Sequence, residues 1–336
     1  MNRCYRLVFN KATQVWQVVS EIAKSHSKSA AVVMLPVSML LAANVWADLA
    51  VNALPTGGNV VAGQSNITQS GNQLNIQQTT QKSIINWNTY NIGANATVNY
   101  VQPNASAISL NRVVGQDPSQ ILGKLTANGQ VWLINSNGVL FGKGAQVNVG
   151  GLVASTLNIA DDDFLNSNYH FTGNTGSVVN MGSIVANNGG YAAMLAPEVR
   201  NEGIVSALQG NASLVAGDAI TLDFNGNGLI NVQVDSTNIN TLVENKHLIK
   251  VGGGQVLMGT RAADGLITSV INNSGRIEAS TMVSEGGIVR LTGAKTVINS
   301  GEISAISSGN KGGTVHLLGE NVGMFSCVFT LIITTN

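Results

Sequence analysis

Residues 111–142 read NRVVGQDPSQILGKLTANGQVWLINSNGVLFG and combine short apolar strands with closely spaced Asn and Gly residues. Val131–Ile134 is one such strand. It ends at Asn135, Asn137 and Gly138, residue types that tolerate left-handed backbone conformations. No helix-length apolar period lies nearby, and the stretch contains no cluster of catalytic residue types. A chain that turns this often predicts coils of short strand rather than an enzyme cleft.

A repeat begins at about residue 176. Each copy contains an Asn-x-Gly element, and Gly-Gly elements follow that start a second short strand. The Asn-x-Gly glycines are Gly182, Gly203, Gly275 and Gly301, and a degenerate copy at 244–251 has His247 in the glycine position. Periods of about 20 to 50 residues indicate stacked structural units.

Stacking such units pairs each short strand with its neighbours above and below and fills a narrow core with Val, Ile, Leu and Ala. The pattern therefore predicts an all-β fold, a right-handed parallel β-helix (β-solenoid) from about residue 60 to 320, with an amino-terminal β cap. The best candidate for a helical turn after the leader is Pro118–Leu125. The recurring Asn predicts either a side-chain ladder along the stack or only a residue type that suits the turn.

The first 47 residues have the features of a targeting segment. They hold five of the 17 basic residues and one of the 17 acidic residues, so the rest of the chain has a net charge of −4. The apolar run Ala30–Leu41 is too short to span a bilayer, which needs about 20 residues. Small residues at Val45 and Ala47 predict cleavage after Ala47, and we expect a helical or disordered leader. The acidic balance argues against nucleic acid as a partner.

The stretch Leu110–Phe164 resembles the secretion domain of filamentous-haemagglutinin-type exoproteins, and the resemblance extends over residues 1 to about 230. The leader is similar to the extended signal peptide region of that family. Asn135–Gly138 matches a family motif that normally reads Asn-Pro-Asn-Gly, and Ser136 stands at the proline position. The resemblance implies two-partner secretion in a Gram-negative bacterium. A signal peptide takes the chain across the inner membrane, an outer-membrane barrel transporter then recognises it, and it winds into a β-helix at the cell surface.

The resemblance also implies that this signature carries transporter recognition or the turns that position it. The residues assigned to this role are Asn135, Ser136, Asn137, Gly138, Arg112, Ser119, Gln120 and Asn128. For Arg112 a purely structural role stays open. The sequence predicts no catalytic residue, no cofactor and no metal site, since the histidines lack metal-ligand spacing. Asp161–Asp163 is either a solvated loop or an ion site.

We expect an extended signal peptide over 1–47, a two-partner secretion domain with its cap over 48–175, β-helix repeats over 176–324 and an aberrant apolar tail over 325–336. The tail indicates either a truncated end or a hydrophobic cap. The favoured function is that of a secreted surface adhesin or haemagglutinin fragment, monomeric and not an enzyme. Its expected partners are the transporter and, as further candidates, host-cell surface glycans or proteins. The alternatives are a β-helical polysaccharide-cleaving enzyme, which needs converging carboxylates, and an autotransporter passenger.

Overall fold

The computed structural model describes residues 5–10, 15–20, 49–224, 230–235, 237, 239–261, 267–281, 287–307, 312–325 and 329–330. The chain divides into two compact units, Met1–Ala47 and Asp48–Asn336. In the first unit, β1 (Tyr5–Asn10) pairs antiparallel with β2 (Val15–Ser20). The expectation of a helical or disordered leader is therefore wrong for these two segments, which are rich in β-branched and aromatic residues. The expected cleavage site after Ala47 lies outside the described residues.

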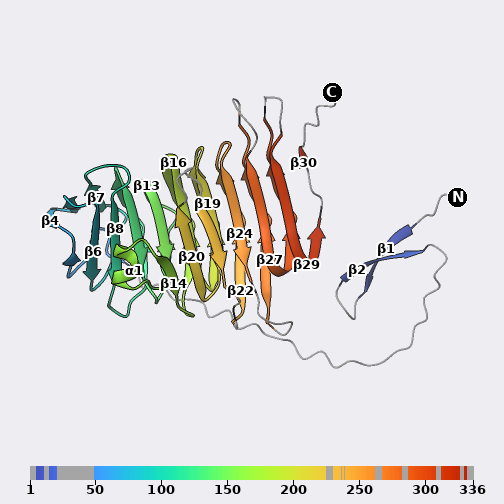
Figure 1. Cartoon of the computed structure of the whole chain (residues 1–336), viewed down its shortest axis with the longest axis horizontal. Coiled ribbons are helices and arrows are strands. Elements are labelled where there is room, and N and C mark those ends of the chain that lie inside the picture. Colours follow the sequence, from blue (N-terminus) through green and yellow to red (C-terminus); the bar gives the residue numbers. More distant parts are fainter. Residues whose placement is uncertain are drawn as a thin grey trace. The chain divides into compact units, whose positions relative to one another are not determined.

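The second unit is a parallel β-helix whose successive coils follow one another from β6 to β29 (Figure 1). Its strands form three faces. The first face comprises β5 (Gln73–Gln78), β7 (Thr97–Val101), β10 (Lys124–Ala127), the start of β13 (Gln146–Ser155), the start of β16 (Ser183–Ala196), β18 (Ile204–Ala207), β23 (Leu248–Lys250), β26 (Arg276–Glu278), β28 (Glu302–Ser304) and β30 (Phe329–Thr330).

The second face comprises β6 (Lys82–Trp87), β8 (Ile108–Val113), β11 (Gln130–Ile134), the ends of β13 and β16, β19 (Asn211–Ala216), β24 (Gln255–Thr260), the start of β27 (Ile288–Asn299) and the start of β29 (Thr314–Met324). The third face comprises β9 (Ser119–Ile121), β12 (Val139–Phe141), β15 (Ser177–Asn180), β17 (Glu198–Asn201), β22 (Thr241–Asn245), β25 (Ser269–Asn273) and the ends of β27 and β29. Crossovers between parallel strands of one sheet are right-handed as a rule, and the predicted parallel β-helix is confirmed.

Antiparallel strands cover the amino-terminal edge of the first coil. β3 (Asn59–Ala62) pairs with β6, and β4 (Ser65–Ser70) pairs with β5. A free sheet edge would invite pairing with other chains, and these strands occupy it. The predicted amino-terminal β cap is therefore confirmed. In the part of the chain that the structure describes, part of the apolar tail joins the ladder, because β30 pairs with β28.

Helix is confined to one short element among the described residues, α1 (Asp161–Leu165). The predicted helical turn at Pro118–Leu125 is wrong, because Ser119–Ile121 form β9 and pair with β12 instead. The neighbouring parallel strand pairs with the backbone N–H and C=O groups of this segment, whereas a single helical turn would leave most of these groups unpaired. No helix among the described residues has the length and apolar character to cross a membrane.

A ladder of buried asparagines runs through the coils of the repeat. Each amide nitrogen donates to the amide oxygen of the next coil, and each step measures 2.6 to 2.8 Å. The ladder consists of Asn180, Asn201, Asn245, Asn273 and Asn299. The same oxygens also cap the turn, since the Asn180 oxygen accepts from the Gly182 N–H at 3.1 Å. The predicted side-chain ladder is therefore present, and the alternative that Asn only suits the turn is wrong, although the same side chains also cap the turn.

Glycine follows this Asn because the coils stack closely at the turn. A Cβ at Gly203 would lie 2.2 Å from the Gly182 carbonyl oxygen of the preceding coil. Real Cβ atoms do not approach oxygen that closely, so any side chain would force the coils apart. The Asn-x-Gly element thus combines a hydrogen-bond ladder with a close backbone approach.

The second face is covered on its outer side by a small antiparallel sheet. Its strands are β14 (Tyr169–Thr172), β20 (Ala219–Phe224) and β21 (Ile230–Val234), and they belong to two segments that leave the coil between the second and third faces. Trp132 is fully buried between the second face and this sheet, and its indole N–H donates to the Tyr191 hydroxyl at 2.8 Å. Strands of the second face such as β19 are therefore buried on both sides, as in fully covered parallel sheets.

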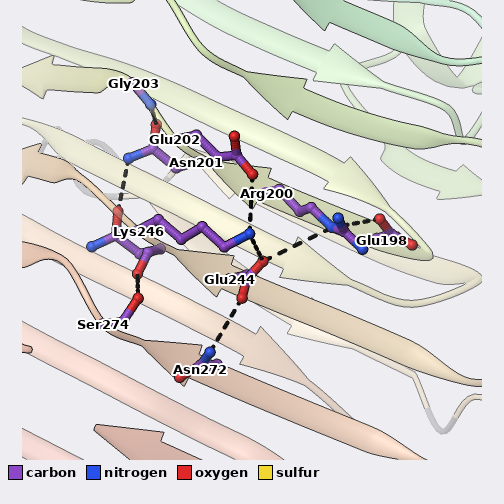
Figure 2. A network of polar contacts seen from close by, with 10 residues as sticks. Glu198, Arg200, Asn201, Glu202, Gly203, Glu244, Lys246, Asn272 and Ser274 are labelled. Atoms are coloured by element: carbon purple, nitrogen blue, oxygen red, sulfur yellow. Dashed lines mark hydrogen bonds and ion pairs between the residues drawn. The ribbon is translucent and has the colours of Figure 1, made fainter. Parts of the chain in front are cut away.

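Charged side chains on the outer surface of the third face form a network across coils (Figure 2). Glu244 lies at its centre. Its carboxylate is 2.9 Å from Lys246 Nζ and accepts from Asn272 Nδ2 at 3.2 Å, and Lys246 also reaches Glu202 at 3.1 Å. Hydrogen bonds to Glu244 and Glu202 raise the pKa of Lys246. Such surface pairs contribute modestly to stability.

Candidate functional site

The predicted recognition turn connects β11 of the second face with β12 of the third face. It is closed by the Gly138 N–H, which donates to the Asn135 carbonyl at 3.0 Å. Gly138 has a φ of 124°, whereas Asn135 and Asn137 have no positive φ. The expectation that these asparagines supply left-handed conformations is wrong. Their amides are used for side-chain hydrogen bonds instead, and glycine alone supplies the unusual backbone angle.

The Asn135 side chain is buried and fully hydrogen-bonded. Its amide nitrogen donates to the Asp117 carbonyl at 2.9 Å and to Ser119 Oγ at 3.0 Å. Its oxygen accepts from the backbone N–H and the side-chain amide of Asn137, at 3.0 and 3.2 Å. Asn137 continues to the Gly115 carbonyl at 3.0 Å. This network uses both donors and both acceptor sites of one buried amide, and it fixes the turn to the loop of the preceding coil.

The outer part of the turn is open to solvent. Ser136 and Asn137 are exposed, while Asn135 and Gly138 are buried. Thr175 Oγ1 donates to the Ser136 carbonyl at 3.1 Å, so the next segment also supports the turn. The arrangement presents two polar side chains on a rigid base.

Arg112 lies beside the turn, since its Cα pairs with that of Ile134. Its guanidinium donates to Asn158 Oδ1 at 2.9 Å and to the Ile159 carbonyl at 2.7 Å, and it pairs with Asp161 at 2.6 Å. The Arg112 side chain is only 15% exposed. These contacts assign Arg112 a structural part in holding the segment that enters α1. Asp161–Asp163 begin that helix, so the predicted solvated loop is wrong for these residues.

Lys82 holds the other end of α1 and was missed by the sequence-based assignment. Its ammonium group donates to the Phe164 carbonyl at 2.7 Å, the Leu165 carbonyl at 3.0 Å and Ser167 Oγ at 2.8 Å. It also lies 5.3 Å from the Phe164 ring centroid. A cation at the carboxyl end of a helix complements the unpaired carbonyls there. Because the partners are more than 80 residues apart, no local pattern signals this contact.

Gln120 and Asn128 are placed differently from each other. Gln120 lies on β9 beside the turn, where its backbone N–H donates to Asn91 Oδ1 at 2.8 Å. Asn128 lies at the opposite end of β11, where its amide exchanges two hydrogen bonds with the Gln102 backbone, at 2.7 and 2.8 Å. The structure therefore gathers Arg112, Ser119, Gln120 and the turn, and it separates Asn128 from them.

A buried polar cluster surrounds Asn111, the first residue of the stretch 111–142. Asn111 Oδ1 accepts from Trp87 Nε1 at 2.9 Å and from the Tyr100 hydroxyl at 2.8 Å. The Tyr90 and Tyr100 hydroxyls are 2.9 Å apart. Burial raises the pKa of both tyrosines. Within the described ranges, no group of three or more His, Cys, Asp and Glu side chains is placed to hold a metal ion.

Several known proteins are similar to this chain. A heme/hemopexin-binding protein of Haemophilus influenzae is 34% identical over 213 residues, which cover 59% of this chain and 23% of that protein. A second heme/hemopexin-binding protein of Haemophilus influenzae is 42% identical over 106 residues, which cover 32% of this chain and 11% of that protein. The chain thus spans less than a quarter of the length of these relatives.

The crystal structure of the HMW1 secretion domain from Haemophilus influenzae matches with a TM-score of 0.59 at 23% identity. The match covers 82% of this chain and 98% of that domain, and it shows the shared fold. Residues 1–46 match the Extended Signal Peptide of Type V secretion system family, and residues 51–305 match the TPS secretion domain family. The protein is thus exported across the inner membrane and secreted by a Gram-negative bacterium. The chain belongs to the family of TPS, or two-partner secretion, domains.

Proposed function

We propose that the exposed pair Ser136 and Asn137 forms part of the surface by which an outer-membrane transporter recognises this domain. The observation that carries the proposal is the buried Asn135 amide, whose four hydrogen bonds hold an otherwise exposed turn in one conformation. A surface that is rigid before it meets its partner loses little conformational entropy on binding. Membership of a two-partner secretion family supports the choice of partner.

The neighbouring residues act as positioning residues in this proposal. Ser119 accepts from Asn135, and Gln120 follows it on β9. Arg112 holds the segment entering α1 beside the turn. Asn128 supports the corner at the other end of β11 and takes no part in the recognition surface.

For the protein as a whole, we propose a secreted surface protein of the adhesin or haemagglutinin type that acts by binding and not by catalysis. The segment limits at residues 47, 175 and 324, cleavage after Ala47, a monomeric state and host-cell surface partners belong to this proposal. Support comes from the secretion-domain family, which is not an enzyme family. The names of the relatives refer to heme and hemopexin, but this chain covers only 23% and 11% of those proteins, so that activity is not carried over.

The test is secretion of the full chain by cells that produce its cognate transporter. Ser136→Glu adds bulk and charge to the exposed turn, and it removes no side-chain hydrogen bond of the Asn135 network. We expect about tenfold less protein in the medium, which corresponds to about 1.4 kcal/mol of binding free energy. The matched control is Asn168→Glu, which adds the same charge at an exposed residue outside the turn.

Both variants should unfold at the temperature of the parent protein once purified. Equal secretion of the two variants would show that the turn is not part of the recognition surface. A reduced unfolding temperature of Ser136→Glu would show a folding defect, and the less disruptive Ser136→Thr would then decide: the proposal requires Ser136→Thr to be secreted at the parental level while Ser136→Asp is not.

A further inference from the structure

The outer surface of the first face changes character along the stack. In β5, β7, β10 and β13 the outward side chains are amides and hydroxyls, accompanied by the cation Lys124. We name these residues the amide face, which comprises Gln73, Asn75, Thr97, Asn99, Thr126, Gln146 and Asn148. Later strands of the same face carry the charged residues Lys250, Arg276, Glu278 and Glu302. The strands between them, the start of β16 and β18, carry no charged residue. The amide face is therefore a weakly charged part of the first face, whose charged residues lie in the last coils.

One row of the amide face continues in register from coil to coil. Asn75, Asn99, Thr126 and Asn148 are successive Cα partners. Thr126 Oγ1 donates to Asn99 Oδ1 at 2.8 Å, and Asn99 Nδ2 lies 3.5 Å from Asn75 Oδ1. Asn148 is exposed, and its side chain has no hydrogen-bond partner among the described residues. The row thus repeats at the strand spacing of about 4.8 Å and ends in an amide with unused donors and acceptors.

The row borders a shallow hollow of about 450 Å³ at the corner between the first and second faces. Asn128 and Asn187 line it together with Val101, a residue that is 50% exposed. The Asn187 amide also has no partner within the described part of the chain, whereas the Gln102 backbone holds the Asn128 amide in place. The hollow therefore combines a fixed amide, a free amide and a small apolar surface.

We propose that the amide face and this hollow bind an extended, uncharged polysaccharide chain that lies along the helix axis. Planar amides donate and accept at once, which suits neighbouring sugar hydroxyls. Val101 offers an apolar contact for the C–H groups of a sugar ring. The near absence of charge gives no attraction for a polyanion or a polycation.

A peptide strand is a poorer fit to the same surface. Strand addition needs unpaired backbone groups at a sheet edge, whereas β7 and β10 are paired on both sides within the sheet. A row of side chains that recurs once per coil instead suits a polymer with a short, regular repeat. The inference concerns a different face from the recognition turn, so it does not depend on the function proposed above.

The test titrates the full chain with soluble hexasaccharides of β-1,4-linked glucose and of β-1,4-linked N-acetylglucosamine, using isothermal titration calorimetry. We expect saturable binding of at least one probe. Asn99→Ala and Asn148→Ala should each raise its Kd about tenfold, as for the loss of one or two hydrogen bonds. Asn168→Ala, at an exposed Asn away from this face, should leave the Kd unchanged.

Asn148→Ala removes no intramolecular hydrogen bond, so it tests the site even if Asn99→Ala is unstable. Lack of saturable binding of both probes, or equal binding by Asn148→Ala and Asn168→Ala, would overturn the proposal. Reduced secretion of Asn148→Ala in the absence of any saccharide binding would assign the surface to the transporter and would overturn it as well.

Discussion

Asn135 Nδ2 donates to Ser119 Oγ over 3.0 Å, and this contact ties a turn to the first residue of β9 in the preceding coil. The two side chains are both fully buried. The turn is therefore not a free loop between two strands, because its conformation depends on the coil that precedes it. The effects of substitutions at the exposed residues of the turn can therefore be distinguished from the effects of substitutions at its buried base.

Replacement of Ser136 by proline should preserve the turn. Ser136 occupies the second position of a turn closed by Gly138 N–H and Asn135 O, where proline's fixed φ is favoured. Ser136→Pro should raise the free energy of unfolding by roughly 0.4 to 1 kcal/mol by restricting the unfolded chain, and secretion should equal or exceed that of the parent. Chemical denaturation and the amount of secreted protein check the two effects. A destabilised variant would show that Ser136 has a backbone geometry that proline cannot adopt.

Removal of one member of the asparagine ladder should cost more than removal of a half-buried asparagine beside the ladder. Asn245→Ala deletes the hydrogen bonds to Asn201 and Asn273 and leaves buried amide groups without these partners. We expect a loss of about 2 kcal/mol in the free energy of unfolding. Asn272→Ala, next to the ladder but pointing outward to Glu244, should cost about 0.5 kcal/mol. Denaturant unfolding of both variants tests this prediction. Similar losses in the free energy of unfolding would mean that the ladder contributes little to stability beyond its part in the turn.

Loss of the Lys82 ammonium should loosen α1 without unfolding the coils. Lys82→Met keeps the aliphatic chain but removes the donors to Phe164 and Leu165. Amide hydrogen exchange in α1 should become about tenfold faster, because the local opening free energy falls by roughly 1.4 kcal/mol. Lys124→Met, at an exposed lysine of the first face, is the control and should leave exchange in α1 unchanged. Unchanged exchange in Lys82→Met would show that Arg112 alone holds the segment.

Alkaline pH should destabilise the fold through its buried tyrosines. Burial raises the pKa of Tyr90, Tyr100 and Tyr191 above the ordinary value of 10.0. Their contribution to stability is therefore fully present below that value and is lost as the pH rises through the higher folded-state pKa values. The reason is that the tyrosines of the unfolded chain lose their protons at a lower pH than those of the folded protein. The free energy of unfolding should fall above about pH 10, and Tyr191→Phe should make the fall less steep.

Absorbance of ionised tyrosine provides the direct measurement for this prediction. In the folded protein the signal should lag behind that of the denatured chain as the pH rises. Complete ionisation of the tyrosines near their ordinary pKa, with the fold intact, would contradict the buried hydroxyl pairs.

The repeated pattern made the fold predictable, because each coil meets the same requirements at the same positions. The recurring Asn indicated the ladder at Asn180 as one of two alternatives, whereas the close approach at Gly203 became visible only in the structure. The candidate site was predictable only in part. The sequence marked the turn at Asn135 but not the backbone angle of Asn137, which depends on hydrogen bonds to another coil. It also missed Lys82, since that contact exists only once distant coils are stacked.

The corner between the second and third faces accepts segments of very different length. In one coil only the turn at 135–138 separates β11 from β12, whereas 156–176 separate β13 from β15 and 217–240 separate β19 from β22 in the sequence. The ladder asparagines are 21, 44, 28 and 26 residues apart, and the largest step contains the segment 217–240, yet their hydrogen bonds have nearly the same length. The length of the segment at this corner thus does not affect the spacing between coils. The corner is a natural point for evolution, or for protein engineering, to graft a foreign loop and display it on a scaffold that does not change.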